Sequence, residues 1–128
     1  MMKIIYLGVG SLMGGFARYF LTGAIHRGVG SAFPYGTLAV NLAGCFLIGF
    51  LSALADEKFF LGSEGRLLLM TGFCGAFTTF STFMLENGNL VKGGDPIRAL
   101  INVGMSLIGG YIVFKFGIFF AKFFNIAS

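Results

Sequence analysis

Residues 72–83 of this chain read Gly72-Phe73-Cys74-Gly75-Ala76-Phe77-Thr78-Thr79-Phe80-Ser81-Thr82-Phe83. The stretch lies in a segment apolar enough to cross a membrane, yet it carries four hydroxyl groups and two glycines and has no charge. Lipid tolerates a polar, glycine-interrupted helix only where that helix is buried in protein or lines a cavity. We therefore interpret residues 72–83 as the inside of a pathway for a solute.

The rest of the sequence has the composition of an integral membrane protein. Of its 128 residues, 56% are hydrophobic and 11% are charged, whereas a soluble domain carries about 25% charged residues. A spanning helix needs about 20 apolar residues, and the charged residues divide the chain into four such runs. We predict one all-α domain of four transmembrane helices, with the third helix broken near its centre, over approximate residues 3–25, 34–55, 64–89 and 96–124.

Several function classes are disfavoured by the distribution of ionisable residues. The nine basic residues are scattered over the four runs and make no basic face for nucleic acid. The two cysteines lie inside predicted spans, and the only histidine, His26, falls in a predicted loop, so the sequence has no cluster of metal ligands. Neither a catalytic constellation nor a carboxylate near the middle of a span is present. These features favour a passive pathway over an enzyme or a pump.

The expected break in the third helix has two possible consequences. The glycine and β-branched threonines of residues 75–79 should interrupt the helix near the membrane centre and free backbone carbonyl groups. A bound cation could satisfy these oxygens, because carbonyl groups suit hard ions. Hydrogen bonds to neighbouring helices could satisfy them equally well, and the sequence leaves both possibilities open.

Aromatic and polar residues around the break could contact a small anion. Phe80 and Phe83 are three residues apart and share a helix face, and the positive edge of an aromatic ring can approach an anion weakly. Asn41 is the lone amide of the second span, where it could donate to an anion or bond to a neighbouring helix. On spacing alone, the two phenylalanines could equally pack in a core or face lipid. Hydroxyl groups beside the rings come from Thr78, Thr79, Ser81 and Thr82.

Three charged residues fall within or near the spans. Arg18 could snorkel to the membrane interface, or it could form an electropositive vestibule that attracts anions. Lys115 could do the same at the end of another span. Glu86 ends the polar stretch of the third span and could cap that helix or pair with a base such as Arg18.

Basic residues are almost equally divided between the two sides of the predicted bundle. The positive-inside rule needs a bias to fix orientation, and a division of four against three gives almost none. We predict that the chain inserts in both orientations and forms an antiparallel homodimer. One side holds Lys3, Lys58, Arg66 and Lys122, and the other holds Arg27, Lys92 and Arg98.

Three blocks of the sequence resemble the Fluc (CrcB) family of fluoride channels. They are Gly14-Gly15-Phe16-Ala17-Arg18-Tyr19, Gly36-Thr37-Leu38-Ala39-Val40-Asn41-Leu42-Ala43-Gly44 and residues 72–83. The third block is the most specific, and the resemblance extends over the four-helix layout and most of the chain. It implies a passive, fluoride-selective channel that exports cytoplasmic fluoride and protects against fluoride toxicity. It also implies a multi-pass protein of the inner cell membrane and an antiparallel, dual-topology homodimer.

Roles for individual residues follow from the same resemblance. Phe80, Phe83 and Asn41 match the residues that line the fluoride route. Gly75 and Thr78 match positions whose backbone carbonyl groups hold a structural sodium ion at the dimer axis. Arg18 and Glu86 match charged positions of the family. Further hydroxyl groups of the polar pathway would come from Thr79, Ser81, Thr82 and Ser106.

Two other functions fit the length and hydrophobicity of the chain. A small four-helix multidrug exporter would need a carboxylate in the middle of its first helix, and residues 4–25 contain no Asp or Glu. A membrane-embedded assembly subunit would use the polar face of the third span to bind partner helices. Stoichiometric co-purification of a second protein would favour that function.

Overall fold

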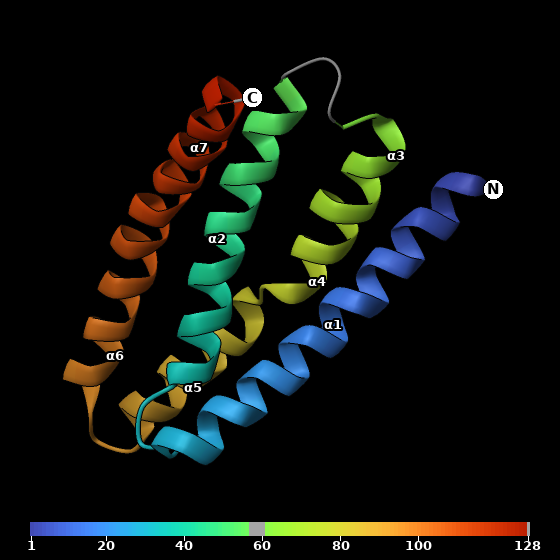
Figure 1. The fold of residues 1–128 in the computed structure, drawn as a ribbon. Coiled ribbons are helices and arrows are strands. Elements are labelled where there is room, and N and C mark those ends of the chain that lie inside the picture. The colour runs from blue at the N-terminus through green and yellow to red at the C-terminus, as the bar shows by residue number, and fades with distance from the viewer. Residues whose placement is uncertain (57–60, 128) are drawn as a thin grey trace.

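The computed structural model describes residues 1–56 and 61–127, with side chains as far as residue 124. Every described element is helical (Figure 1). Lys58, which entered the charge comparison above, and Glu57 lie outside the described residues. The elements are α1 (Met2–Val29), α2 (Tyr35–Asp56), α3 (Ser63–Gly65), η1 (Arg66–Cys74), α4 (Gly75–Phe77), α5 (Phe80–Lys92), α6 (Pro96–Gly104), η2 (Met105–Gly109) and α7 (Gly110–Ala127).

Four helical segments of the described residues are long and apolar enough to span a membrane. They cover Met2–Val29, Tyr35–Asp56, Ser63–Lys92 and Pro96–Phe124. Many of their large apolar side chains are exposed, on α1 and α7 above all, and a soluble protein rarely leaves so wide an apolar surface uncovered. The prediction of an all-α protein with four membrane-spanning segments is confirmed, and the protein is a multi-pass membrane protein.

α2 is the central helix, with α7 on one side and the α1–η1 pair on the other (Figure 1). Glycine allows close packing both of α7 on α2 and of α1 on η1. A Cβ atom added at Gly14 would collide with the backbone carbonyl of Phe73, and one added at Gly49 would collide with the carbonyl of Phe114. Without these side chains the helix backbones approach closely, which is how helices associate in lipid when hydrophobic burial gives little driving force.

The third span contains two residues with extended backbones. α4 ends at Phe77, Thr78 has φ −87° and ψ 159°, Thr79 has φ −151° and ψ 120°, and α5 begins at Phe80. Thr79 is the N-cap of α5, because its hydroxyl oxygen accepts a hydrogen bond from the backbone N–H of Thr82 at 3.3 Å. Within residues 75–79, where the sequence predicts a break, Thr78 and Thr79 are the two residues outside the helices.

Two local features differ from the straight α-helices expected from sequence. The segments η1 and η2 have π-helical hydrogen bonding, which is rare and is often found near functional sites. In addition, α1 continues to Val29, so His26 lies in its last turn and not in a loop, with Arg27 beside it. Basic side chains are favourable there because the C-terminal end of a helix carries partial negative charge.

Candidate functional site

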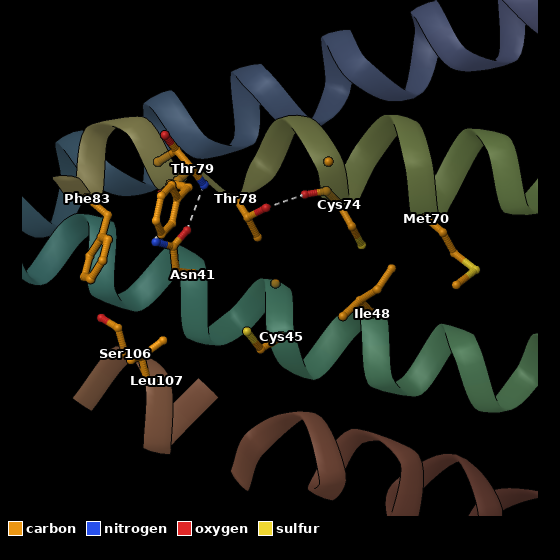
Figure 2. A pocket seen from close by; sticks show the side chains of 13 residues that line it. Asn41, Cys45, Ile48, Met70, Cys74, Thr78, Thr79, Phe83, Ser106 and Leu107 are labelled. Carbon is orange, nitrogen blue, oxygen red and sulfur yellow. Dashed lines mark hydrogen bonds between the residues drawn. The ribbon is translucent and has the colours of Figure 1, made fainter. Parts of the chain in front are cut away.

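A cavity of about 390 Å³ lies beside the interruption of the third span. Its wall combines side chains from the second, third and fourth spans (Figure 2). Figure 2 shows Asn41 facing Thr79, with Phe83 nearby and Ser106 approaching from the fourth span. The lining residues are Asn41, Gly44, Cys45, Ile48, Met70, Cys74, Gly75, Thr78, Thr79, Phe80, Phe83, Ser106 and Leu107, and none of them carries a formal charge.

The side chain of Asn41 bonds to both backbone groups of Thr79. The backbone N–H of Thr79 donates to Asn41 Oδ1 at 2.8 Å, and Asn41 Nδ2 donates to the Thr79 carbonyl at 3.0 Å (Figure 2). The extended backbone at Thr79 takes these groups out of the regular helix ladder, and a side-chain amide can replace both missing partners. An amide nitrogen has two N–H groups, so Asn41 can still offer a donor to the cavity that it lines.

Phe80 and Phe83 both line the cavity from the first turn of α5. Their ring centroids are 5.8 Å apart and the rings are tilted by 40°. Their environments differ, because Phe83 is only 6% exposed and Phe80 is 73% exposed. The two rings thus lie together as predicted from their spacing, but in a single chain only Phe83 is enclosed.

The hydroxyl groups that the sequence predicts for the pathway differ in their hydrogen bonding and in their distance from the cavity. Thr79 Oγ1 donates to Thr82 Oγ1 at 3.0 Å, and Thr78 Oγ1 donates to the carbonyl of Cys74 at 3.0 Å. Ser106 Oγ is buried in the cavity wall and has no hydrogen-bond partner among the described residues. Ser81 is exposed and lines neither this cavity nor the hollow described next.

A second hollow of about 640 Å³ lies between α1, α2 and α5. Arg18, Arg27 and Glu86 line it together with Thr82 and Thr79. Thr79 also lines the first cavity, so this residue of the interruption borders both spaces. The hollow therefore has the form of a vestibule, with two guanidinium groups in its wall.

Glu86 accepts a hydrogen bond from Thr37 in this vestibule, and the described residues show no salt bridge between Glu86 and Arg18. The hydroxyl of Thr37 donates to Glu86 Oε1 at 2.7 Å, while Glu86 Oε2 is buried without a hydrogen-bond partner among the described residues. Arg18 Nη1 instead donates to the Thr78 carbonyl, at 3.5 Å. Lys115 is exposed on α7 and lines neither space.

Gly75 and Thr78 lie on the wall of the first cavity. Gly75 is exposed, and a Cβ atom added to it would meet nothing within 4 Å. The extended conformation of Thr78 takes its carbonyl out of the helix ladder. Two carbonyl groups of one chain could supply only part of the oxygen shell of a hard cation, which takes six or more ligands in many sites.

Comparison with known proteins places the sequence in a family. Residues 5–118 match the family described as "CrcB-like protein, Camphor Resistance (CrcB)". The chain belongs to the CrcB-like family. A curated relative from Chlorobaculum tepidum is 46% identical over 95% of this chain and 96% of its own length. One from Chlorobium phaeobacteroides (strain BS1) is 44% identical over 93% and 92%, and one from Methylocella silvestris is 42% identical over 84% and 83%. All three relatives are named "Fluoride-specific ion channel FluC".

The structure of this CrcB-like chain also brings together residues that sequence reasoning did not select. Thr37 lies four residues before Asn41, hence on the same face of α2, and it lines the vestibule, whereas Asn41 lines the cavity. Asn87 and Asn102 form a buried amide pair between α5 and α6. The presence of one asparagine in each of two apolar spans could have indicated this pair, because amide groups in lipid require hydrogen-bond partners.

Proposed function

We propose that this member of the CrcB-like family is a passive, fluoride-selective ion channel that exports cytoplasmic fluoride and so protects the cell against fluoride toxicity. The names of relatives that match more than nine-tenths of the chain support the choice of ion. The observation that carries the mechanism is the uncharged cavity at the interruption of the third span, lined by two aromatic rings, an amide and a hydroxyl without a hydrogen-bond partner among the described residues. Such groups bind an anion without holding it too tightly for conduction.

The proposed route begins in the vestibule. Arg18 and Arg27 raise the local concentration of anions there. The anion then passes Thr82 and Thr79, of which Thr79 borders both the vestibule and the cavity, and loses water as it reaches Asn41. The free amide N–H of Asn41, the Ser106 hydroxyl and the edges of Phe80 and Phe83 replace part of its hydration shell. Membrane potential, negative inside, drives the anion outward.

The functional unit that we propose is an antiparallel dimer. Phe80 is highly exposed, and the cavity that it lines is open on one side. Both features support a second copy of the chain that covers Phe80 and closes the cavity. The near-equal division of basic residues supports insertion in both orientations. In this arrangement each chain contributes its interruption to the two-fold axis, and the protein resides in the inner cell membrane.

A sodium ion at this axis is part of the same proposal. The carbonyl groups of Gly75 and Thr78 from two chains would hold it, and its charge would stabilise the facing interruptions. The fit rests on the Thr78 carbonyl, which the extended backbone frees from the helix ladder and whose second lone pair remains beside the 3.5 Å contact from Arg18 Nη1, and on the open space beside Gly75. Carbonyl oxygens are suitable ligands for such a hard cation.

Fluoride efflux from liposomes tests the proposed function. Vesicles that hold the purified protein are loaded with potassium fluoride and diluted into fluoride-free buffer, and a potassium ionophore is added while a fluoride electrode records release. We expect rapid fluoride release, with no release from matched vesicles loaded with chloride. Vesicles that contain folded protein but release neither ion would contradict the proposal, and equal release of both ions would contradict selectivity.

A further inference from the structure

Two buried asparagines connect the third and fourth spans next to Phe83. Asn102 Nδ2 donates to Asn87 Oδ1 at 3.0 Å, and Asn87 Nδ2 donates to the backbone carbonyl of Phe83 at 2.9 Å. Asn102 is 1% exposed and Asn87 is 7% exposed. The two bonds thus connect Asn102 of α6, through Asn87, to Phe83 of α5, whose ring lines the cavity.

The other buried residues of α5 and α6 are apolar, namely Phe83 and Ala99. Asn102 Oδ1 is buried and has no hydrogen-bond partner among the described residues, so the contact leaves a polar atom unpaired in a setting where that is costly. A leucine pair would fill a helix interface without this cost. An amide pair, unlike a leucine pair, fixes one register between two helices, because its hydrogen bond forms in only one alignment.

The register of α6 also sets the position of Ser106. Ser106 follows Asn102 by four residues, about one helical turn, and lies in η2 directly after α6. Its hydroxyl is buried in the wall of the cavity that Phe83 also lines. Because Asn102 bonds to Asn87, which bonds to the Phe83 carbonyl, a shift of α6 would change the gap between the Ser106 hydroxyl and the Phe83 ring.

We propose that Asn87 and Asn102 are positioning residues for conduction, which hold α6 in register against the Phe83 turn and so fix the gap between Phe83 and Ser106. This inference rests on the proposed fluoride channel. Neither amide contacts the anion, and both act through the two residues that they place. The expected effect is therefore on the fluoride affinity and conductance of the cavity, beyond any effect on folding.

Planar-bilayer recordings of fluoride current against fluoride concentration test this inference. The variants are Asn87→Leu, Asn102→Leu and the double Leu variant, with Asn89→Leu as a matched change at an exposed position of the same helix. Each single Leu variant should lower the limiting current about tenfold, equivalent to about 1.4 kcal/mol in a barrier. The double variant should recover a monodisperse protein in gel filtration, because two leucines pack together, but it should keep the low current.

The controls separate this inference from the proposed function and from simple misfolding. Asn102→Gln retains the amide and should carry more current than Asn102→Leu. Wild-type current from the double Leu variant, or from either single variant, would overturn the positioning role. Less current from Asn102→Gln than from Asn102→Leu would do the same. An unmodified protein that passes no fluoride would instead contradict the channel itself.

Discussion

Asn41 completes the hydrogen bonding of Thr79 at the interruption of the third span. One side chain of α2 accepts from the Thr79 N–H and donates to the Thr79 carbonyl, so the second span stabilises the gap in the third. The same side chain lines the cavity. A structural role and a role in the pathway are therefore compatible, although sequence analysis treated them as alternatives.

Asn41→Asp should abolish most of the fluoride flux. The carboxylate keeps the acceptor for the Thr79 N–H, but it loses the donor to the Thr79 carbonyl and places a negative charge in the cavity, which repels an anion. We expect at least about a tenfold loss of efflux, equivalent to about 1.4 kcal/mol. The liposome assay measures it, with Asn89→Asp at an exposed position as the control. Wild-type efflux from Asn41→Asp would remove Asn41 from the pathway.

Isoleucine substitutions at the two rings should separate conduction from stability. Phe80→Ile and Phe83→Ile both remove an aromatic edge from the cavity, so both should reduce efflux sharply. Only Phe83 is enclosed in the single chain, so Phe83→Ile should also lower its stability, by about 1–2 kcal/mol. Phe119→Ile, at an exposed position of α7, should leave efflux unchanged. If neither ring variant affects efflux, the anion does not pass between these rings.

The bond from Thr37 to Glu86 should matter for conduction through the vestibule. Thr37→Val keeps the shape of the side chain but removes the donor to Glu86 Oε1, which leaves both carboxylate oxygens without a described donor. The loss of one such bond costs about 1 kcal/mol of stability, and a carboxylate without its donor exposes more negative charge to anions in the vestibule, which should lower efflux. Thr37→Ser retains the hydroxyl and should remain close to wild type. Equal efflux from the valine and serine variants would show that this bond is unimportant.

Close packing of α1 against η1 should make Gly14 intolerant of substitution. In Gly14→Ala the new methyl group collides with the Phe73 carbonyl, and relief of the collision requires the helices to separate, at a cost of about 1–3 kcal/mol. Gly15→Ala is the matched control, because a Cβ atom there meets nothing within 4 Å. Thermal unfolding in detergent should show a lower Tm for Gly14→Ala only. A similar Tm for both variants would argue against this packing.

The sequence was sufficient to predict the four spans, because charged residues separate the apolar runs and each run has the length of a membrane-spanning helix. It also predicted that Phe80, Phe83 and Asn41 lie together, since helical spacing and the resemblance placed them on the same pathway. It did not predict that Asn41 bonds to Thr79, because the partner of a buried amide depends on the register between two helices. Register is set by close glycine contacts such as those of Gly14, and a hydropathy pattern does not specify these distances.

The same reason explains the pairs that were missed. Thr37 and Glu86 are 49 residues apart in sequence, and Asn87 and Asn102 come from different helices. Each of these polar residues signals that it needs a partner, but only the packed bundle specifies which one. The π-helical hydrogen bonding of η1 and η2 has no comparable signal in composition or periodicity.

Labelling from both sides of the membrane should detect both orientations of the chain. Ser31 is exposed between α1 and α2, so Ser31→Cys in a background with Cys45→Ala and Cys74→Ala presents one thiol at one end of the bundle. In inside-out and right-side-out vesicles, a membrane-impermeant maleimide should label about half of the protein in each, since a weak bias of basic residues leaves orientation undetermined. Nearly complete labelling in one type of vesicle and none in the other would contradict dual topology, and with it the antiparallel dimer.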